Sequence, residues 1–152
     1  MQKLSFGIRG VPENWMNTQG NKHSAFFAQR RRFYKWRETV AILGSAAREH
    51  AGWPRAEMDS PRRRIQIHQI RHGELDIDGL WTSSKPVIDG LKAWLYYKYT
   101  ESGNFISEMG KQEGPALIYD DGAKYCEMLP ATQEVTRLKE MLTIVTVEII
   151  EP

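Results

Sequence analysis

Hydrophobic and polar residues alternate along several short stretches of the chain and recur at helical spacing along two longer ones. Loose alternation over 3–9 predicts a first strand, and alternation over 65–69 predicts a second, half-buried one. A β-branched run over 143–150 predicts a third strand. Between the first two, apolar residues at helical spacing predict a long helix from about 28 to 50, which ends before Gly52.

The pattern predicts a second helix that begins near Ser84. Pro86 suits its first turn, where the backbone N–H groups lack helical partners in any case. Its apolar stripe follows the i, i+3, i+4, i+7 spacing of a helix packed on a core and comprises Val87, Ile88, Leu91, Trp94 and Leu95. The remaining predictions are a loop at 101–115, short strands at 116–119 and 124–129, and a short helix at 131–142.

This order of strands and helices predicts an α/β (α+β) fold in which helices pack on a mixed β-sheet. The length of 152 residues fits a single domain, 1–152, and the 41% hydrophobic content suits a folded chain. The apolar runs are too short to span a bilayer, so we expect no membrane partner. Cys126 is the single cysteine, which excludes an internal disulfide and favours a cytoplasmic location.

Positive charge is concentrated in two arginine blocks, although the net charge is only +2. The blocks are Arg30, Arg31 and Arg32, and Arg62, Arg63 and Arg64. Arginine blocks of this kind bind the phosphates of a DNA backbone in many proteins, so these residues are candidates for DNA binding. The alternative interpretation is that each block is a solvated surface that keeps the protein soluble.

The stretch from Glu74 to Leu95 carries the candidate chemistry. Asp76 and Asp78 are two positions apart, which places them on one face of an extended backbone. Lys85 and Asp89 are four positions apart, which places them on one face of a helix. Carboxylates and a lysine that meet where a strand passes into a helix suit a hard cation such as Mg²⁺ and metal-assisted cleavage of a phosphodiester.

Taken in order, these motifs resemble the RusA family of Holliday junction resolvases. In that family a D-x-D-N-L motif ends a strand, K-x-x-x-D-A-L follows on a helix, and a D-D pair comes later before a strand. The corresponding stretches here are Asp76-Ile-Asp78-Gly79-Leu80, Lys85-Pro-Val-Ile-Asp89-Gly-Leu91 and Asp120-Asp121. The head of the chain is also similar, through Pro12-Glu13-Asn14, so the resemblance spans nearly the whole chain. The central motif is its specific part.

The resemblance implies a homodimer that needs Mg²⁺ or Mn²⁺ and cuts two opposed strands of a four-way DNA junction. It implies roles for six residues: Asp76, Asp78 and Asp121 as metal ligands, Lys85 as the catalytic lysine, and Asp89 and Asp120 as carboxylates that support the site or anchor the helix. The arginine blocks would then hold neighbouring phosphates, contacts that position DNA without reading its sequence.

The chain also departs from the family pattern. Three extra residues within Trp81–Ser84 separate the D-x-D from Lys85, and Gly79 replaces the usual asparagine. Leu75 stands where a basic residue commonly precedes the first aspartate. The interval from Asp89 to the Asp120-Asp121 pair is long, so the sequence predicts an insertion between the second helix and the last acids.

Other interpretations remain open at the level of sequence. Glycosyltransferases also use a D-x-D to hold a metal and a sugar nucleotide, and a lysine in the first turn of a helix is often simply solvated. Trp81, Trp94 and Tyr97 are typical of a core or a dimer contact rather than of base stacking. Within DNA metabolism, the alternatives are a non-catalytic binder of branched DNA with the same fold and a nuclease for flaps or other branched DNA.

Overall fold

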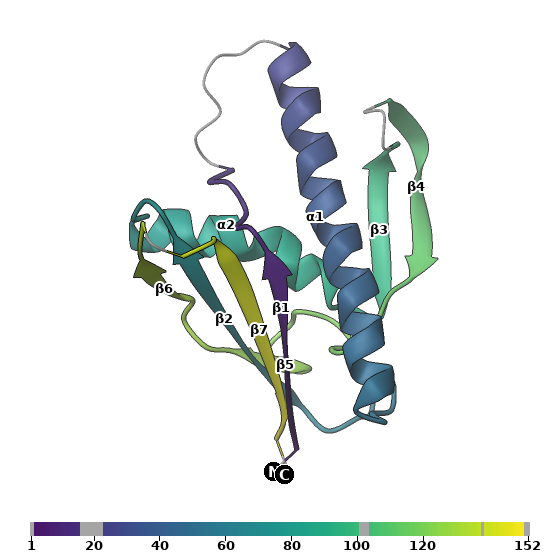
Figure 1. Ribbon diagram of the computed structural model, residues 1–152. Helices are drawn as coiled ribbons and strands as arrows, with labels where there is room; N and C mark the ends of the chain where they lie inside the picture. Colours follow the sequence, from purple (N-terminus) through teal and green to yellow (C-terminus); the bar gives the residue numbers. More distant parts are fainter. Residues whose placement is uncertain (1, 16–22, 101–103, 138, 151–152) are drawn as a thin grey trace.

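The computed structural model describes residues 2–15, 23–100, 104–137 and 139–150 (Figure 1). Its elements follow the order β1 (Lys3–Arg9), α1 (His23–His50), β2 (Arg63–Arg71), α2 (Ile77–Gly90), β3 (Trp94–Tyr99), β4 (Phe105–Glu113), β5 (Cys126–Met128), β6 (Thr132–Val135) and β7 (Leu142–Ile149).

The main sheet is mixed, as the sequence predicts. Its strand order is β1-β7-β2-β5, and β6 also pairs with β2. Strand β7 is antiparallel to both β1 and β2, whereas β5 and β6 run parallel to β2. The predicted fold class, a mixed sheet with helices packed on it in a single domain, is therefore confirmed.

Strand register gathers the apolar side chains on one face of this sheet. Leu4 lies opposite Val147, and Val147 lies opposite Ile65 on its other side. Because side chains alternate between faces, the next inward row is formed two residues further along each strand, by Phe6, Val145 and Ile67. Val40 of α1 and Val87 and Ile88 of α2 join these residues in one core cluster. Both helices therefore cover the same core.

The following inward row, formed by Ile8, Thr143 and Gln69, contains two polar side chains, and Gln69 anchors α2 to the sheet. Gln69 is fully buried, and its Nε2 donates to the hydroxyl oxygens of Ser83 at 3.0 Å and Ser84 at 3.1 Å. In the same row, Thr143 Oγ1 donates to the carbonyl oxygen of Gly10 at 2.9 Å. Buried polar groups that are paired in this way fix α2 against β2 in one register.

A hairpin of β3 and β4 forms a separate two-stranded sheet, and α1 lies between it and the main sheet (Figure 1). The base of the hairpin is closed by backbone hydrogen bonds. Gly114 N donates to Ala93 O at 2.8 Å, and Leu117 N donates to Leu91 O at 3.0 Å. The hairpin occupies the interval between Asp89 and the later acidic pair in which the family resemblance predicts an insertion.

The second helix differs from its prediction at both ends. It begins at Ile77 rather than near Ser84, because Asp76 caps it, and it ends at Gly90. Trp94 and Leu95, which the helical spacing assigned to its stripe, belong to β3 instead. The burial of this segment alternates, with Ala93 and Leu95 buried and Trp94 and Tyr96 exposed, which is the period of a strand.

Three other predictions are wrong, and several are confirmed. The predicted loop at 101–115 contains β4, and the predicted helix at 131–142 contains β6, which pairs with β2 far away in sequence. The stretch 116–119 forms an isolated bridge between Ile118 and Lys92 rather than a strand. The predicted strands at 3–9, 65–69, 124–129 and 143–150 and the long helix are present, although the helix begins earlier, at His23.

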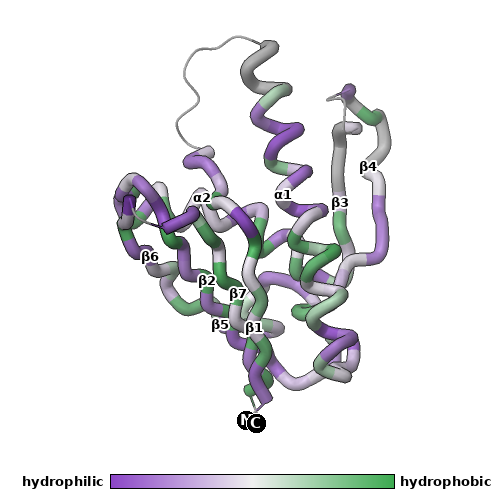
Figure 2. Tube along the Cα trace, viewed as in Figure 1, coloured by the Kyte–Doolittle hydropathy of each residue, from purple (hydrophilic) through white to green (hydrophobic). Residues whose placement is uncertain are grey.

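Hydrophilic residues follow the upper part of α1, where the first arginine block lies, while hydrophobic and hydrophilic residues alternate along the strands of the main sheet (Figure 2). In the described part of the chain, no helix has the length and apolar character needed to cross a membrane.

Gly90 sets how closely the two helices approach. A Cβ at this position would lie 2.7 Å from the carbonyl oxygen of Arg37 and 2.7 Å from the Cβ of Val40, both on α1. We expect Gly90→Ala to lower the free energy of unfolding by about 1–3 kcal/mol through overpacking, despite the better helix propensity of alanine. Gly73→Ala is the control, because no atom lies within 4 Å of its Cβ. Urea denaturation would measure both, and equal effects would contradict the expectation.

Candidate active site

The D-x-D motif lies at the start of α2 rather than on a strand. Asp76 is the N-cap residue, and its Oδ1 accepts a hydrogen bond from Gly79 N at 2.7 Å. Asp78 falls in the first helical turn. The prediction that these two aspartates share one face of an extended backbone is therefore wrong. Both are exposed to solvent, and Ile77 between them is 87% exposed.

Glycine at position 79 lets the head of the chain approach this helix start. A Cβ there would lie 2.7 Å from Asp76 Oδ1 and 2.8 Å from Asn14 Nδ2. Nearby, Arg71 donates from Nη1 to the carbonyl oxygen of Pro12 at 3.1 Å. The Pro-Glu-Asn segment that the sequence singles out is thus held against the D-x-D motif.

Asp78 shares a helical face with Lys85 and Asp89. Seven residues make nearly two turns, so Asp78 precedes Lys85 by about 10 Å along the helix axis. Lys85 Nζ lies 3.3 Å from Asp89 Oδ1, as the four-residue spacing predicts. Lys85 therefore lies about two turns from Asp78 along the helix and on the same face.

The Asp120-Asp121 pair, which follows the β3–β4 hairpin in sequence, lies against this face of α2. Lys85 Nζ donates to Asp121 Oδ2 at 2.9 Å across 36 positions of sequence. The Asp120-Asp121 bend is fixed locally by a hydrogen bond from Asp121 N to Asp120 Oδ1 at 2.9 Å. The structure therefore brings together Lys85, Asp89, Asp120 and Asp121 of the predicted site.

Lys92 completes this cluster, and the sequence interpretation missed it. Its Nζ lies 3.1 Å from Asp89 Oδ1, 3.4 Å from Asp120 Oδ1 and 3.0 Å from Asp121 Oδ1. Its side chain is only 18% exposed, against 49% for Lys85. The ammonium group of Lys92 thus occupies a point where three carboxylates meet. Its spacing of three residues from Asp89 was the signal available in the sequence.

The lysines and carboxylates of this cluster stabilise each other's charged forms. Burial by itself would raise the pKa of Asp121, but hydrogen bonds and charges from Lys85 and Lys92 hold that pKa well below its usual range. Burial opposes the charge of each lysine, yet hydrogen bonding to Asp121 and the charge of Asp89 raise the pKa of both. All three groups are ionised at neutral pH.

Cys126 lies in β5, a few residues beyond this cluster. Burial, together with the negative charge of Asp121, raises the pKa of its thiol to about 11. The thiolate is the nucleophilic form, so this cysteine is inert at neutral pH.

The second arginine block does not form one DNA-binding surface. Arg63 is 2% exposed and lies over the ring of Trp53 at 5.2 Å, and burial lowers the pKa of its guanidinium. Arg64 is bound by Glu127 at 2.9 Å and by Glu148 at 3.5 Å. The prediction that all three arginines contact DNA is therefore wrong for Arg63, while Arg62 is exposed.

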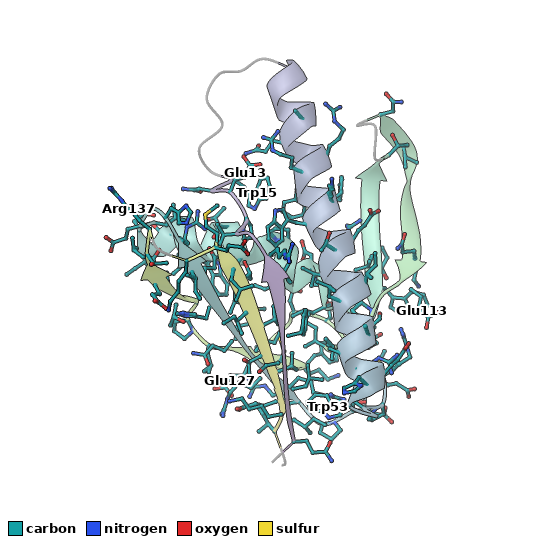
Figure 3. The ribbon with its side chains drawn as sticks, in the orientation of Figure 1. Glu13, Trp15, Trp53, Glu113, Glu127 and Arg137 are labelled. Carbon is teal, nitrogen blue, oxygen red and sulfur yellow. The ribbon has the colours of Figure 1, made fainter. Side chains whose placement is uncertain are left out.

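The first block lies on α1 with its side chains at the surface. Arg31 and Arg32 are exposed and Arg30 is half-buried. Arg32 donates to both carboxylate oxygens of Glu13, from Nε at 2.5 Å and from Nη2 at 3.2 Å. Figure 3 shows Glu13 between the end of β1 and α1.

The predicted metal ligands are not gathered as a coordination sphere requires. Mg²⁺ needs oxygen ligands at about 2.0–2.1 Å around one point. Asp76 caps a helix, whereas the oxygens of Asp121 are bound by two lysines. Within 2–15, 23–100, 104–137 and 139–150, no group of three or more histidine, cysteine, aspartate or glutamate side chains is placed to hold a metal ion. The set Asp76, Asp78 and Asp121 does not fit a shared cation in this arrangement.

Comparisons with protein-family models and with curated protein sequences find no match for this chain. The site's function therefore has to be argued from its own residues.

The difference in burial between the two lysines leads to a first prediction for this site. Lys92→Met leaves Asp120 without an ion pair and leaves Lys85 alone to offset Asp89 and Asp121, so we expect it to lower the free energy of unfolding by about 2 kcal/mol. Lys85→Met removes a more exposed charge, and we expect a loss below about 1 kcal/mol. Denaturant unfolding at neutral pH measures both variants. A larger loss for Lys85→Met would show that Lys92 is not the main counter-ion.

The lowered pKa of Asp121 predicts a specific loss of stability in acid. Its folded-state pKa lies below the unfolded value of about 3.9, so its contribution is present above that value and is lost as pH falls. Between pH 5 and pH 3 we expect the free energy of unfolding to fall by about 1 kcal/mol more in the wild type than in Asp121→Asn. Urea denaturation across this pH range gives the comparison, and parallel pH profiles would contradict the assignment.

Proposed function

We propose that the protein is a structure-specific endodeoxyribonuclease that cuts four-way DNA junctions, like the RusA family that its motifs resemble. The observation that supports this is the contact between Lys85 and Asp121. It joins the central motif to the later acidic pair in spite of the inserted hairpin. A chance match of short motifs would have no reason to bring these two segments together.

The charges of this face suit chemistry on a phosphodiester. The substrate carries one negative charge and gains more in the transition state of hydrolysis. Lys85 and Lys92 provide two ammonium groups, and the more exposed Lys85 is the one that an incoming phosphate would meet. Preorganised positive groups of this kind stabilise developing charge. Asp78, exposed on the same helical face, makes no ion pair or side-chain hydrogen bond within the described part of the chain.

Mg²⁺ or Mn²⁺ is the cofactor that the resemblance implies. A bound cation would polarise the phosphate and make a water molecule more acidic. The predicted ligands do not surround one point, so we assign no reaction step to the cation. The dependence of cleavage on Mg²⁺ is left to experiment. A C₂ homodimer would supply two sites for paired cuts across a two-fold junction.

A second function is favoured by one observation. Asp121, a predicted metal ligand, is already neutralised by two lysines. A protein with this arrangement could bind branched DNA without cutting it. Incubation of the purified protein with labelled four-way, three-way and linear DNA, with and without Mg²⁺, separates the two functions, since the binder would shift the four-way junction in a gel and leave it intact.

Asp78→Asn tests the proposed nuclease directly. We expect it to reduce Mg²⁺-dependent cleavage of a four-way junction by about a hundredfold or more while junction binding in a gel shift stays nearly unchanged. Asp59→Asn is the matched control, because Asp59 is an exposed aspartate in the connection between α1 and β2. Full cleavage by Asp78→Asn would refute the assignment of this residue.

A further inference from the structure

A hollow of about 520 Å³ lies between the end of β1 and α1. It is distinct from the cluster of Lys85, Lys92 and Asp121. Its apolar side is formed by Ile8, Val11 and Trp36, and its basic side chains are Arg9, Arg32 and Lys35. An aromatic and apolar surface beside several cations suits a ligand that has both a flat ring and an anionic group.

Two of the three cations are available to such a ligand. Arg32 is bound by Glu13, so these two charges largely offset each other. Arg9 and Lys35 have exposed side chains, and neither makes an ion pair or a side-chain hydrogen bond within the part of the chain that the structure describes. The hollow therefore carries positive charge that no neighbouring carboxylate neutralises.

The positive surface continues beyond the hollow along α1. A second hollow of about 370 Å³ shares Arg32 and Lys35 with the first and is also lined by Arg31, Tyr34 and Glu38, so basic residues outnumber its one acid. A ligand longer than one ring and one phosphate could follow this surface. A charged polymer with aromatic units fits such a path better than a small metabolite does, because basic grooves with aromatic platforms are the usual way to hold single-stranded nucleic acid.

The hollow also adjoins the candidate active site through the head of the chain. Glu13 lines the hollow and pairs with Arg32. The next residue, Asn14, packs against Gly79 in the first turn of α2, directly after the D-x-D motif. Adjacent residues of the chain therefore contact the hollow and the start of α2.

We propose that this hollow binds one unpaired nucleotide of a DNA strand, with its base on Trp36 and its phosphate between Arg9 and Lys35. The choice of DNA rests on the proposed function, which this inference deepens. A branched substrate would be held beside the D-x-D motif through a nucleotide taken out of its duplex. Stacking on an aromatic ring accepts any base, so this contact recognises the unpaired state rather than the sequence.

Binding measured in EDTA tests the phosphate contacts without cleavage. The probe is a fluorescein-labelled short oligothymidylate, compared with its duplex. We expect the wild type to prefer the single strand and the double variant Arg9→Ala/Lys35→Ala to bind it about tenfold more weakly, with a salt dependence shallower by about one unit. Lys3→Ala/Lys139→Ala is the control, because it removes two exposed charges elsewhere. Equal affinity of the Arg9/Lys35 variant and the wild type would overturn the proposal.

A second arm tests the base contact. Thymidine monophosphate should quench tryptophan fluorescence in the wild type and in Trp94→Leu but not in Trp36→Leu, whose folding is checked by its unfolding transition. Inorganic phosphate that binds as tightly as the nucleotide would overturn the proposal, since the hollow would then be a simple anion site. If Trp36→Leu fails to fold, the proposal is still tested by the single-strand affinity of Arg9→Ala/Lys35→Ala and by the comparison of inorganic phosphate with thymidine monophosphate.

The two proposals can fail separately. A protein that binds the single strand in EDTA as expected but cuts no DNA would retain the nucleotide site and refute the nuclease. A protein that cuts four-way junctions, while Arg9→Ala/Lys35→Ala leaves single-strand affinity unchanged, would retain the nuclease and refute the nucleotide site.

Discussion

The candidate site depends on the backbone pairing that closes the base of the β3–β4 hairpin. The carbonyl oxygen of Leu91 accepts from both Leu117 N at 3.0 Å and Ile118 N at 3.1 Å, and all three side chains are fully buried. Gly114 is required there, since a Cβ would lie 2.2 Å from the carbonyl oxygen of Lys92. Because the chain leaves and returns at one fixed point, the length of the hairpin beyond it does not alter where the acidic pair emerges.

The charges at the two ends of α2 stabilise the helix and also suit the proposed chemistry. Asp76 and Asp78 lie at its N-terminus, where the helix dipole favours negative charge, and Lys92 follows its C-terminus, where the dipole favours positive charge. The motif therefore has a structural role that would be needed in any protein with this helix. What the helix alone does not require is that Asp120 and Asp121 meet Lys92 from another part of the chain. That meeting fixes the acidic pair against the end of the helix.

Sequence patterns predicted the parts of the fold in which one face of a strand is buried. The strands around Leu4, Ile65 and Val145 alternate because they cover a core on one side only. The start of α2 was missed because an aspartate at an N-cap and one on a strand give the same local pattern, and hydrogen bonding to Gly79 decides between them. Lys92 was missed because its three partners meet only after the hairpin closes, and the pairing of β6 with β2 is likewise long-range.

Net charge is a poor guide to what this protein binds, because most of its arginines already have structural roles. Arg37 donates to the carbonyl oxygen of Tyr96 and lies over the ring of Tyr34, and Arg63 is buried against Trp53. Arg64 is neutralised by carboxylates. Among the described residues, cations without such partners include Arg9 and Lys35, which face one hollow near the D-x-D motif. The hollow therefore carries positive charge that the net charge of +2 does not reveal.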